Sequence, residues 1–346
     1  MPTIYCPPEW APQSGVMLTW PHAQSDWRDH LDLVEPVFVE LVQQISLHQK
    51  LLISCWNDAH LAAVKIRLTL ADVDMNNVLL YAVPSNDTWV RDHGPITVLV
   101  DGVPHLLSFT FNGWGHKFDA ALDNQLTQQL HTLGSFGDTP LQTIHFVLEG
   151  GGIDVDGAGT LLTTRRCLMA PTRNPHLNQQ QIEATLNELL GVDRFLWLDH
   201  GYLAGDDTDS HIDTLARFCD AGTITYVACD DPEDEHYTEL KAMENELKVF
   251  RTRDGQPYTL IPLPWPKAKY DDDGHRLPAT YANFLILNNV VLVPTYADWA
   301  DKAALVQIKK CFPEREIIAV SCQPLILQHG SLHCVTMQLP AGVLHE

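Results

Sequence analysis

The end of the chain contains a cysteine in a setting that suits chemistry. Cys334 follows His333 in the string HGSLHCVTMQ (329–338), after Gly330 and Ser331. Cysteine is the strongest nucleophile that a protein offers near neutral pH, provided that neighbouring groups lower its pKa. If Cys334 stood alone, a buried thiol in a last edge strand would explain it better. Other residues must therefore decide between a nucleophile and a core side chain.

Other ionisable residues share that kind of setting. They stand beside glycine, serine or a turn: Asp92 in RDHGP (91–95), Glu149 in EGGGID (149–154), and His211 and Asp213 in DSHID (209–213). Singly, each has an ordinary structural explanation as a turn cap, a surface carboxylate, a core histidine or a hydrogen-bonded strand residue. Together, two carboxylates can hold one guanidinium, and a histidine can protonate a leaving amine and then deprotonate water. With Cys334, the set suits attack of a thiolate on a cationic, planar carbon, without a metal.

These residues coincide with a repeating order of predicted elements. Two strands, a helix and a third strand recur four times, at a spacing of roughly 55–65 residues. The predicted helices span 119–131, 178–190, 232–248 and 298–310. The predicted strands span 96–100, 105–110, 144–148, 161–164, 167–170, 195–198, 211–218, 223–229, 258–261, 284–287, 290–294 and 316–320. Because equivalent positions of a radial repeat converge on one centre, the candidate residues, which open the first strands, should face one small cavity.

The two ends of the chain are predicted to complete a fifth unit together. Strand 333–339 has too little chain after it to form a unit, and strand 15–20, helix 35–49 and strand 51–55 supply the missing parts. A ring closed in this way leaves no exposed sheet edge. An additional helix and strand within 58–83 has no place in the repeat. We therefore predict a single α/β domain over residues 1–346.

Composition limits the classes of partner. Forty-four Asp and Glu residues against 22 Lys and Arg give a formal net charge of −22, which disfavours nucleic acid and anionic membranes and favours cationic ligands. The sequence has no secretory signal and no apolar run of membrane-spanning length. Its eight cysteines are scattered without a C-x-x-C pair, so neither a zinc framework nor a disulfide scaffold is expected. These features predict a cytoplasmic protein with reduced thiols.

Five strings resemble the agmatine deiminase / bacterial-type peptidyl-arginine deiminase family of the guanidine-modifying superfamily. They are NDTWVRDHGP (86–95), FNGWGHKF (111–118), EGGGIDVDGAGTLLTT (149–164), GDDTDSHIDTLARF (205–218) and HGSLHCVTMQ (329–338). The resemblance runs from WPHAQSDWRD (20–29) to Cys334. It implies a five-bladed α/β propeller of ββαβ units with pseudo-fivefold symmetry. The chain departs from the family pattern at Ser331, which replaces a second glycine before the nucleophile.

The resemblance also implies roles for single residues. These are Cys334 as nucleophile, His211 as acid and base, Asp92 and Asp213 as guanidinium clamps, Glu149 as the carboxylate that supports the histidine, and Trp89 as a wall against the alkyl chain. Gly151 is expected at the substrate as well. One of the acidic residues before His211, for which we take Asp207, is expected to meet the distal amine of the substrate. No metal or cofactor is expected.

The predicted reaction is the hydrolysis of agmatine to N-carbamoylputrescine and ammonia, a step toward putrescine in polyamine metabolism. Free arginine, peptidyl-arginine, amidino transfer to an amine, and a non-catalytic module that binds cationic amines remain alternatives. A site selective for arginine would need a cation for the substrate carboxylate. Arg91 is predicted to face away from Asp92, whereas Arg217 could share a face with Asp213. The oligomeric state stays open, a homodimer included, and 262–281 is predicted to be a long loop of the lid or binding type.

Overall fold

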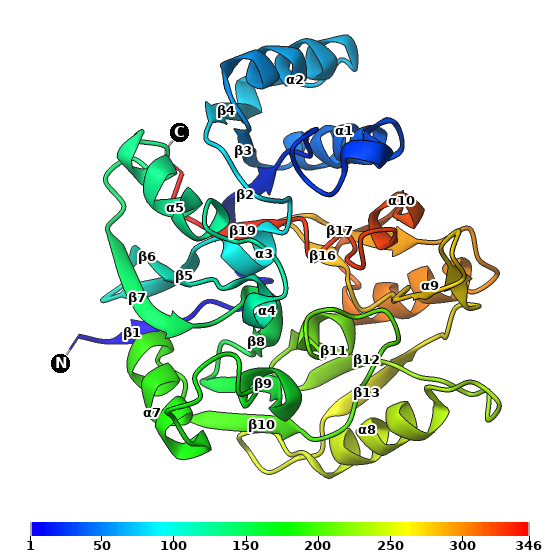
Figure 1. Ribbon diagram of the computed structural model, residues 1–346. Helices are drawn as coiled ribbons and strands as arrows, with labels where there is room; N and C mark the ends of the chain where they lie inside the picture. Colours follow the sequence, from blue (N-terminus) through cyan, green and yellow to red (C-terminus); the bar gives the residue numbers. More distant parts are fainter. Residues whose placement is uncertain (1, 345–346) are drawn as a thin grey trace.

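The computed structural model, which describes residues 2–344, has a mixed α/β fold built from small sheets. Figure 1 shows the strands toward the middle of the molecule and the longer helices around the outside. These helices are α1 (Leu31–Ser46), α2 (Asp58–Leu70), α5 (Asp123–Thr132), α7 (Gln179–Leu190), α8 (Tyr237–Val249) and α9 (Asp301–Cys311). Four short α-helices are α3 (Val90–His93), α4 (Gly113–His116), α6 (Arg165–Leu168) and α10 (Gln323–Ile326). The 3-10 turns are η1 (Arg28–His30), η2 (Met75–Asn77), η3 (Gly150–Gly152) and η4 (Ile212–Thr214).

One strand order recurs in five of the sheets. An antiparallel pair is followed by a strand parallel to its second member, and a helix connects the two parallel strands. In chain order, these triplets are β5 (Ile96–Val100), β6 (Val103–Thr110) and β7 (Leu141–Val147); β8 (Ile153–Val155), β9 (Thr160–Thr164) and β10 (Arg194–Leu198); β11 (Ala216–Asp220), β12 (Thr223–Val227) and β13 (Thr259–Leu263); and β16 (Leu285–Ile286), β17 (Val290–Thr295) and β18 (Glu316–Ser321). The predicted ββαβ order is confirmed in these four units.

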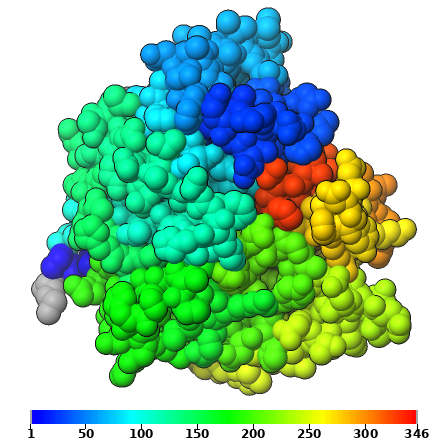
Figure 2. Space-filling view, in the orientation of Figure 1, coloured from blue at the N-terminus to red at the C-terminus, as the bar shows by residue number. Residues whose placement is uncertain are grey.

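The fifth sheet joins the two ends of the chain, as the sequence predicts. Strand β19 (Met337–Pro340) pairs antiparallel with β2 (Gln13–Thr19), which lies parallel to β3 (Lys50–Cys55). The helix and strand of 58–83 are α2 and β4 (Val78–Ala82), and β4 extends this sheet beyond β3. A further N-terminal strand, β1 (Ile4–Tyr5), pairs with β5. Figure 2 shows red C-terminal residues packed beside the dark-blue N-terminal part on the visible face.

The first strands of two units begin later than predicted, and the first two strands of another unit are shifted toward the N-terminus. The predicted strand 211–218 opens with the turn η4, and β11 begins only at Ala216. The predicted strand 333–339 begins at Met337, because the backbone N–H groups of His333 and Cys334 are bound by the side-chain oxygen of Asn283. In the unit with predicted strands 161–164 and 167–170, the first strand is β8, which begins at Ile153, and residues 161–164 belong to the second strand, β9. Residues 167–170 are not a strand: they lie in and after α6, which is capped by the Thr164 side chain.

Each longer helix covers its sheet with an apolar stripe. In α7, Ile182, Leu186 and Leu190 recur every fourth residue and are buried, as expected for one face of a helix. The strands beneath are buried on both faces: all five residues of β9 are buried, as are five of the six in β17. Within the described part of the chain, no helix is both long and apolar enough to cross a bilayer.

The 262–281 segment is more ordered than predicted. It carries a two-stranded hairpin, β14 (Lys269–Tyr270) and β15 (Arg276–Leu277). Arg276 pairs with Asp234 at 2.6 Å and with Glu235 at 2.9 Å, and it lies over the ring of Trp265. These contacts fix the hairpin against the beginning of α8.

Candidate active site

The candidate residues lie on short turns that lead into the first strand of their unit. Asp92 is in α3 before β5, Gly151 is in η3 before β8, and Asp213 is in η4 before β11. Backbone contacts join α3 to η3 and η3 to η4. The repeat therefore brings these turns together, as the sequence predicts, although the residues stand on turns and not within strands.

A cavity of about 150 Å³ opens above these turns, with Cys334 and Asp92 among the residues that line it. Aromatic rings of Trp89, Trp114 and Phe118 form part of its wall. Five of its lining residues are aspartates: Asp26, Asp87, Asp92, Asp206 and Asp207. Among the described residues, neither lysine nor arginine lines it. The cavity thus combines apolar surface with negative charge, which suits a ligand that carries an alkyl chain and positive charge.

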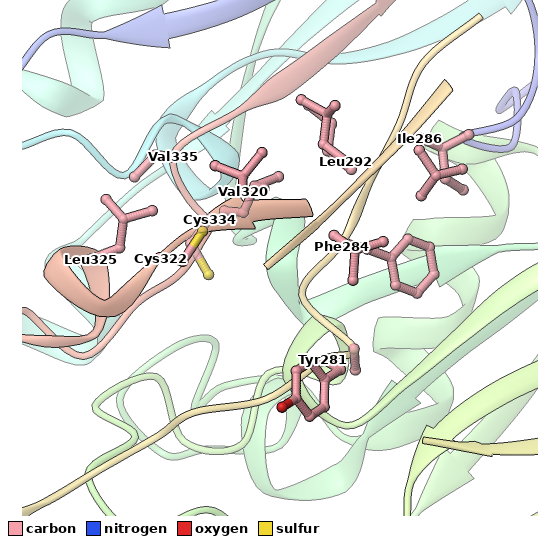
Figure 3. Packing of buried hydrophobic residues seen from close by; sticks show 14 of the residues in the cluster. Tyr281, Phe284, Ile286, Leu292, Val320, Cys322, Leu325, Cys334 and Val335 are labelled. Carbon is pink, nitrogen blue, oxygen red and sulfur yellow. The ribbon is translucent and has the colours of Figure 1, made fainter. Parts of the chain in front are cut away.

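Cys334 lies at the edge of the apolar core and contacts polar groups. Figure 3 shows it among the buried apolar residues of the largest core cluster, and 7% of its surface is exposed. Its Sγ lies 3.4 Å from the Asn283 Oδ1 and 3.6 Å from the Asp213 Oδ2. Burial, followed by the charges of Asp213 and Asp92, raises the pKa of the Cys334 thiol well above its usual value. A cation bound between Asp92 and Asp213 would offset their negative charges and so lower the pKa of the Cys334 thiol.

Asp92 is held by two hydrogen bonds. Its Oδ1 accepts the backbone N–H of Gly151 at 2.9 Å, and its Oδ2 accepts the indole N–H of Trp114 at 2.9 Å. The Nδ1 of His211 lies 3.6 Å from Oδ1. Burial raises the pKa of Asp92 to about 6, although the charge of His211 works in the opposite direction. The carboxylate is therefore oriented toward the cavity before a ligand arrives.

Asp213 is the more strongly ionised of the two. Its Oδ2 lies 2.8 Å from the Nδ1 of His333, whereas its Oδ1 is buried without a hydrogen-bond partner. Burial raises the pKa of Asp213, but the hydrogen bond and charge of His333 outweigh that effect and hold the pKa below its ordinary value. A buried carboxylate oxygen without a partner is costly, and a guanidinium N–H would satisfy it.

His211 lies next to Asp92 and also close to the buried side chains of Cys167 and Glu149. Burial lowers its pKa, but Asp92 and then Cys167 raise it, with the net result well above the usual value. Among the described residues, none meets the geometric criteria of a hydrogen bond to the His211 Nε2, although the Cys167 thiol lies within 4.8 Å of the ring. Glu149 is fully buried and pairs with Arg173 at 2.8 Å, while its second oxygen, Oε2, also has no partner. Glu149 thus lies near the histidine without a direct hydrogen bond to it.

Within residues 2–344, one group of side chains has the spacing for a metal ion. The ligand atoms of Glu149, Cys167 and His211 all lie within 4.8 Å of one another. The guanidinium of Arg173 already occupies one oxygen of Glu149, and its charge disfavours a divalent cation at that place.

The absence of a side chain at Gly151 leaves space for the side chains of His211, Asp92 and Asp213. A Cβ at this position would lie 2.7 Å from His211 Nδ1, 2.8 Å from Asp92 Oδ1 and 3.1 Å from Asp213 Oδ2. These atoms belong to three of the candidate residues, and none of them can withdraw without leaving its own contacts. The missing side chain of Gly151 is therefore a requirement of the site.

We expect Gly151→Ala to lower kcat/KM by at least about 10²-fold, because a displacement of roughly 1 Å at reacting groups has effects of this size. Steady-state kinetics on the purified variant measures the loss. Gly222→Ala is the matched control, since its Cβ would meet one side-chain atom at 3.6 Å and its φ is not left-handed. A Gly151→Ala enzyme within threefold of the native rate would contradict this geometry.

Trp89 is fixed against the turn that precedes Cys334. A Cβ at Gly330 would lie 2.1 Å from the indole ring, so only glycine allows this turn to lie flat on the ring. Ser331, the departure from the family pattern, is accommodated by a hydrogen bond of 2.8 Å between its hydroxyl and that of Tyr296. The serine thus has a polar partner inside the core.

Among the aspartates in 206–209, Asp206 and Asp209 use their carboxylates in contacts within the protein, whereas Asp207 directs its carboxylate to the cavity. Asp206 accepts the backbone N–H groups of Thr208 and Ser210. Asp209 pairs with Arg173 at 2.6 Å and Lys117 at 2.8 Å. Asp207 offers its backbone carbonyl to Lys117, and its side chain lines the cavity. Burial raises the pKa of Asp207.

The two arginines near the site sequences point away from the cavity. Arg91 contacts the Glu9 carboxylate at 3.3 Å and also binds Gln338. Arg217 binds Glu9, donates to the carbonyl of Phe284 at 3.1 Å and lies over the ring of that residue. The expected orientation of Arg91 is confirmed. Arg217, which could share a face with Asp213, is not among the described residues that line the cavity, and its buried guanidinium binds Glu9 and the carbonyl of Phe284.

Sequence analysis does not predict several residues that the structure places in the site. These are Glu9, Trp114, Arg173, Asn283 and His333. Trp114 lies in the quoted string 111–118, where its positive φ of 54° turns the indole toward Asp92. Asn283 lies between two apolar segments and is fully buried. A polar residue in such a position must find partners, and this is the only signal that could have identified it.

Comparison with known proteins is consistent with this geometry. Residues 5–340 match the Porphyromonas-type peptidyl-arginine deiminase family. An agmatine deiminase from Stutzerimonas stutzeri is 34% identical, with 97% of this chain and 95% of the relative covered. The structure of a substrate-bound agmatine deiminase from C. jejuni is 39% identical, with a TM-score of 0.91 over 99% of this chain and 98% of that one.

A Porphyromonas gingivalis structure, provisionally described as an arginine deiminase, is 52% identical, with a TM-score of 0.93 over 99% of this chain and 100% of that one. An amidinotransferase from Microseira wollei, at 12% identity and a TM-score of 0.51, shares the fold alone. The family match spans nearly the whole chain and includes every candidate residue. The chain therefore belongs to the Porphyromonas-type peptidyl-arginine deiminase family and is an agmatine deiminase-like enzyme.

Proposed function

We propose that the protein hydrolyses agmatine to N-carbamoylputrescine and ammonia through a covalent amidino (thiouronium) intermediate on Cys334. One observation carries this proposal: the Cys334 thiol stands beside two oriented carboxylates, and an oxygen of Asp213 is buried without a partner. Such a pair of carboxylates suits the fork of N–H donors of a guanidinium. The proposal assigns Asp92 and Asp213 as clamps and Cys334 as nucleophile.

In the first half-reaction, the bound guanidinium offsets the charges that keep Cys334 protonated, so the thiol loses its proton to solvent and the thiolate attacks the central carbon. His211, whose pKa is raised well above its usual value by Asp92 and Cys167 against the effect of burial, is protonated and donates a proton to the departing nitrogen. The C–N bond breaks and ammonia leaves. Glu149, which pairs with Arg173, stabilises the protonated form of His211 through its negative charge.

In the second half-reaction, neutral His211 takes a proton from water, and the hydroxide attacks the same carbon. Collapse of the tetrahedral species breaks the C–S bond and returns the thiolate. The hydroxyl proton passes to solvent, which leaves a neutral ureido group on the alkyl chain, and the released ammonia takes up a proton from solvent. Overall, a guanidinium and water give a urea group and ammonium. Neither an oxidant nor a second substrate is consumed.

The choice of agmatine rests on the charges around the cavity. Arginine differs by a carboxylate, and Arg91 and Arg217 are both engaged with Glu9 on the other side of the site. Lys117 is held by Asp207 and Asp209. The Asp207 side chain lines the cavity and suits the distal amine, with Trp89 against the methylene groups. The relative from Stutzerimonas stutzeri bears the agmatine deiminase name, whereas the Porphyromonas gingivalis structure makes free arginine the second candidate.

A substrate panel tests this choice. We expect kcat/KM for agmatine to exceed that for arginine or a peptidyl-arginine by at least about 10²-fold, since the carboxylate of arginine would meet aspartates and remain unpaired. Ammonia release and a ureido colour assay report the same turnover independently. A preference for arginine would overturn the substrate assignment and leave the thiolate chemistry in place. No ammonia from any guanidine would favour a non-catalytic amine-binding protein.

We propose further that the five sheets form the blades of one α/β propeller, with pseudo-fivefold symmetry, over the whole chain. This rests on the recurring strand order and on the pairing of β19 with β2. The turns before the first strands would then surround the axis of the ring. Such an arrangement accounts for the convergence of residues from distant parts of the chain on one small cavity.

A further inference from the structure

A buried chain of contacts leads from the cavity to the N-terminal segment. The Nδ1 of His333 lies 2.8 Å from Asp213 Oδ2, and its Nε2 lies 2.8 Å from Glu9 Oε1. The His333 and Asp213 side chains are each 1% exposed and that of Glu9 is 16% exposed. One imidazole thus bridges two carboxylates, of which only Asp213 faces Cys334.

Glu9 is anchored on the side away from His333. It pairs with Arg91 at 3.3 Å and with Arg217, and its Oε2 accepts a hydrogen bond from Gln338 at 2.8 Å. Burial opposes ionisation of Glu9, but Arg217, His333 and Arg91 hold its pKa well below the usual value. The carboxylate is therefore a fixed, charged support for the imidazole.

The contact with His333 decides which oxygen of Asp213 is free. Because Oδ2 is bound to the imidazole, Oδ1 is the oxygen left without a partner in the buried centre. If the imidazole were absent, the carboxylate could rotate, and the clamp would lose its direction. The backbone of this turn does not depend on the imidazole, since Asn283 Oδ1 accepts the His333 N–H at 2.9 Å.

We propose that His333 is a positioning residue, which orients Asp213 toward the guanidinium and is itself oriented by Glu9. This inference rests on the proposed function of the site. A purely structural alternative exists, in which His333 serves only to tie Glu9 and the N-terminal segment into the core. The two roles use different nitrogens of one ring.

Two substitutions separate these roles. The amide nitrogen of asparagine lies near the place of Nδ1, so His333→Asn retains a donor to Asp213 and loses the contact with Glu9. The amide nitrogen of glutamine lies near the place of Nε2, so His333→Gln retains the contact with Glu9 and loses the donor to Asp213. The two variants are similar in size and polarity. The quantity that decides between the roles is therefore the ratio of their kcat/KM values.

We expect His333→Gln to lose about 10²-fold in kcat/KM and His333→Asn to stay within about tenfold of the native enzyme, because misdirecting a clamp group has an effect of this order. Thermal unfolding of both variants reports the structural contribution of the Glu9 contact separately. His131→Asn and His131→Gln are matched controls. This half-buried histidine on α5 lies 2.9 Å from the Thr139 carbonyl and stacks on the Phe136 ring, so both variants should retain activity.

The opposite order, with His333→Gln active and His333→Asn impaired, would overturn the proposal in favour of the structural role, and so would equal losses. Calorimetric titration of agmatine into the Cys334→Ala background separates this result from a wrong substrate. If agmatine is not the ligand, the Cys334→Ala protein fails to bind it whatever residue stands at 333. If only the positioning role is wrong, this protein binds agmatine and the two His333 substitutions weaken binding equally.

Discussion

Replacement of Cys334 by alanine is expected to abolish turnover and to leave agmatine binding measurable. We expect kcat to fall by more than about 10⁴-fold, as for the loss of a nucleophile in other covalent mechanisms. Binding should persist because Asp92 keeps its bonds to Gly151 and Trp114 in the absence of the thiol. Ammonia release under saturating substrate measures the first effect, and calorimetric titration measures the second.

Two further variants sharpen this prediction. Cys334→Ser should be nearly inactive, because a serine hydroxyl needs a strong base, and the side-chain oxygens that contact the Cys334 Sγ are those of Asn283 and the weakly basic Asp213. Cys229→Ala, which removes another buried thiol, should retain activity. An active Cys334→Ala enzyme would contradict the covalent mechanism.

Loss of either clamp charge is expected to have the next largest effect. Asp92→Asn and Asp213→Asn should each weaken transition-state stabilisation by about 3–5 kcal/mol, the range for breaking a buried ion pair by removing one partner. This corresponds to roughly 10²- to several thousand-fold in kcat/KM. Asp213→Asn should be the more severe, since its free Oδ1 and its contact with His333 both depend on the carboxylate.

The matched control is Asp156→Asn. Asp156 is also buried, but its Oδ1 accepts only the backbone N–H groups of Ala158 and Thr160, at 2.7 and 2.8 Å. We expect this variant to stay within about threefold of the native kcat/KM. A loss below tenfold for both Asp92→Asn and Asp213→Asn would show that these carboxylates do not contact the guanidinium.

The order of helices and strands could be predicted wherever the signals were local. The helix predicted over 178–190 is observed as α7, Gln179–Leu190. Asn178 and Gln181 form a capping box at its beginning, and Gly191 ends it with a left-handed φ of 69°. Apolar residues at every fourth position supply the buried face. The capping residues, the buried apolar residues and the glycine that ends the helix all lie within one short stretch of sequence.

The beginnings of β11 and β19 could not be predicted, because distant residues decide them. The apolar and β-branched residues of 333–339 are typical of a strand, yet the turn of His333 and Cys334 is bound by Asn283, some 50 residues earlier. The same applies to η4, where Asn283 donates to the carbonyl of Asp213. Polar tertiary contacts override the local preference in both cases.

The site could be predicted in part for a similar reason. Repetition brings Asp92, Gly151 and Asp213 to equivalent turns, so their convergence follows from the order of elements. The side chains that orient them do not recur. Trp114 binds Asp92 from a segment with several residues of positive φ, and Glu9 reaches His333 across 324 positions of sequence. No spacing rule relates such pairs.

The most direct test of the account is mass spectrometry of the intact protein, denatured during turnover of agmatine. The sample is the native enzyme quenched in the steady state, because His211 acts in both half-reactions and its removal would slow formation of the adduct as well as its hydrolysis. We predict a gain equal to the mass of agmatine less ammonia, located on the peptide that contains Cys334 and absent from Cys334→Ala. Turnover without an adduct on any residue, or an adduct on Cys167 in place of Cys334, would contradict the proposed nucleophile.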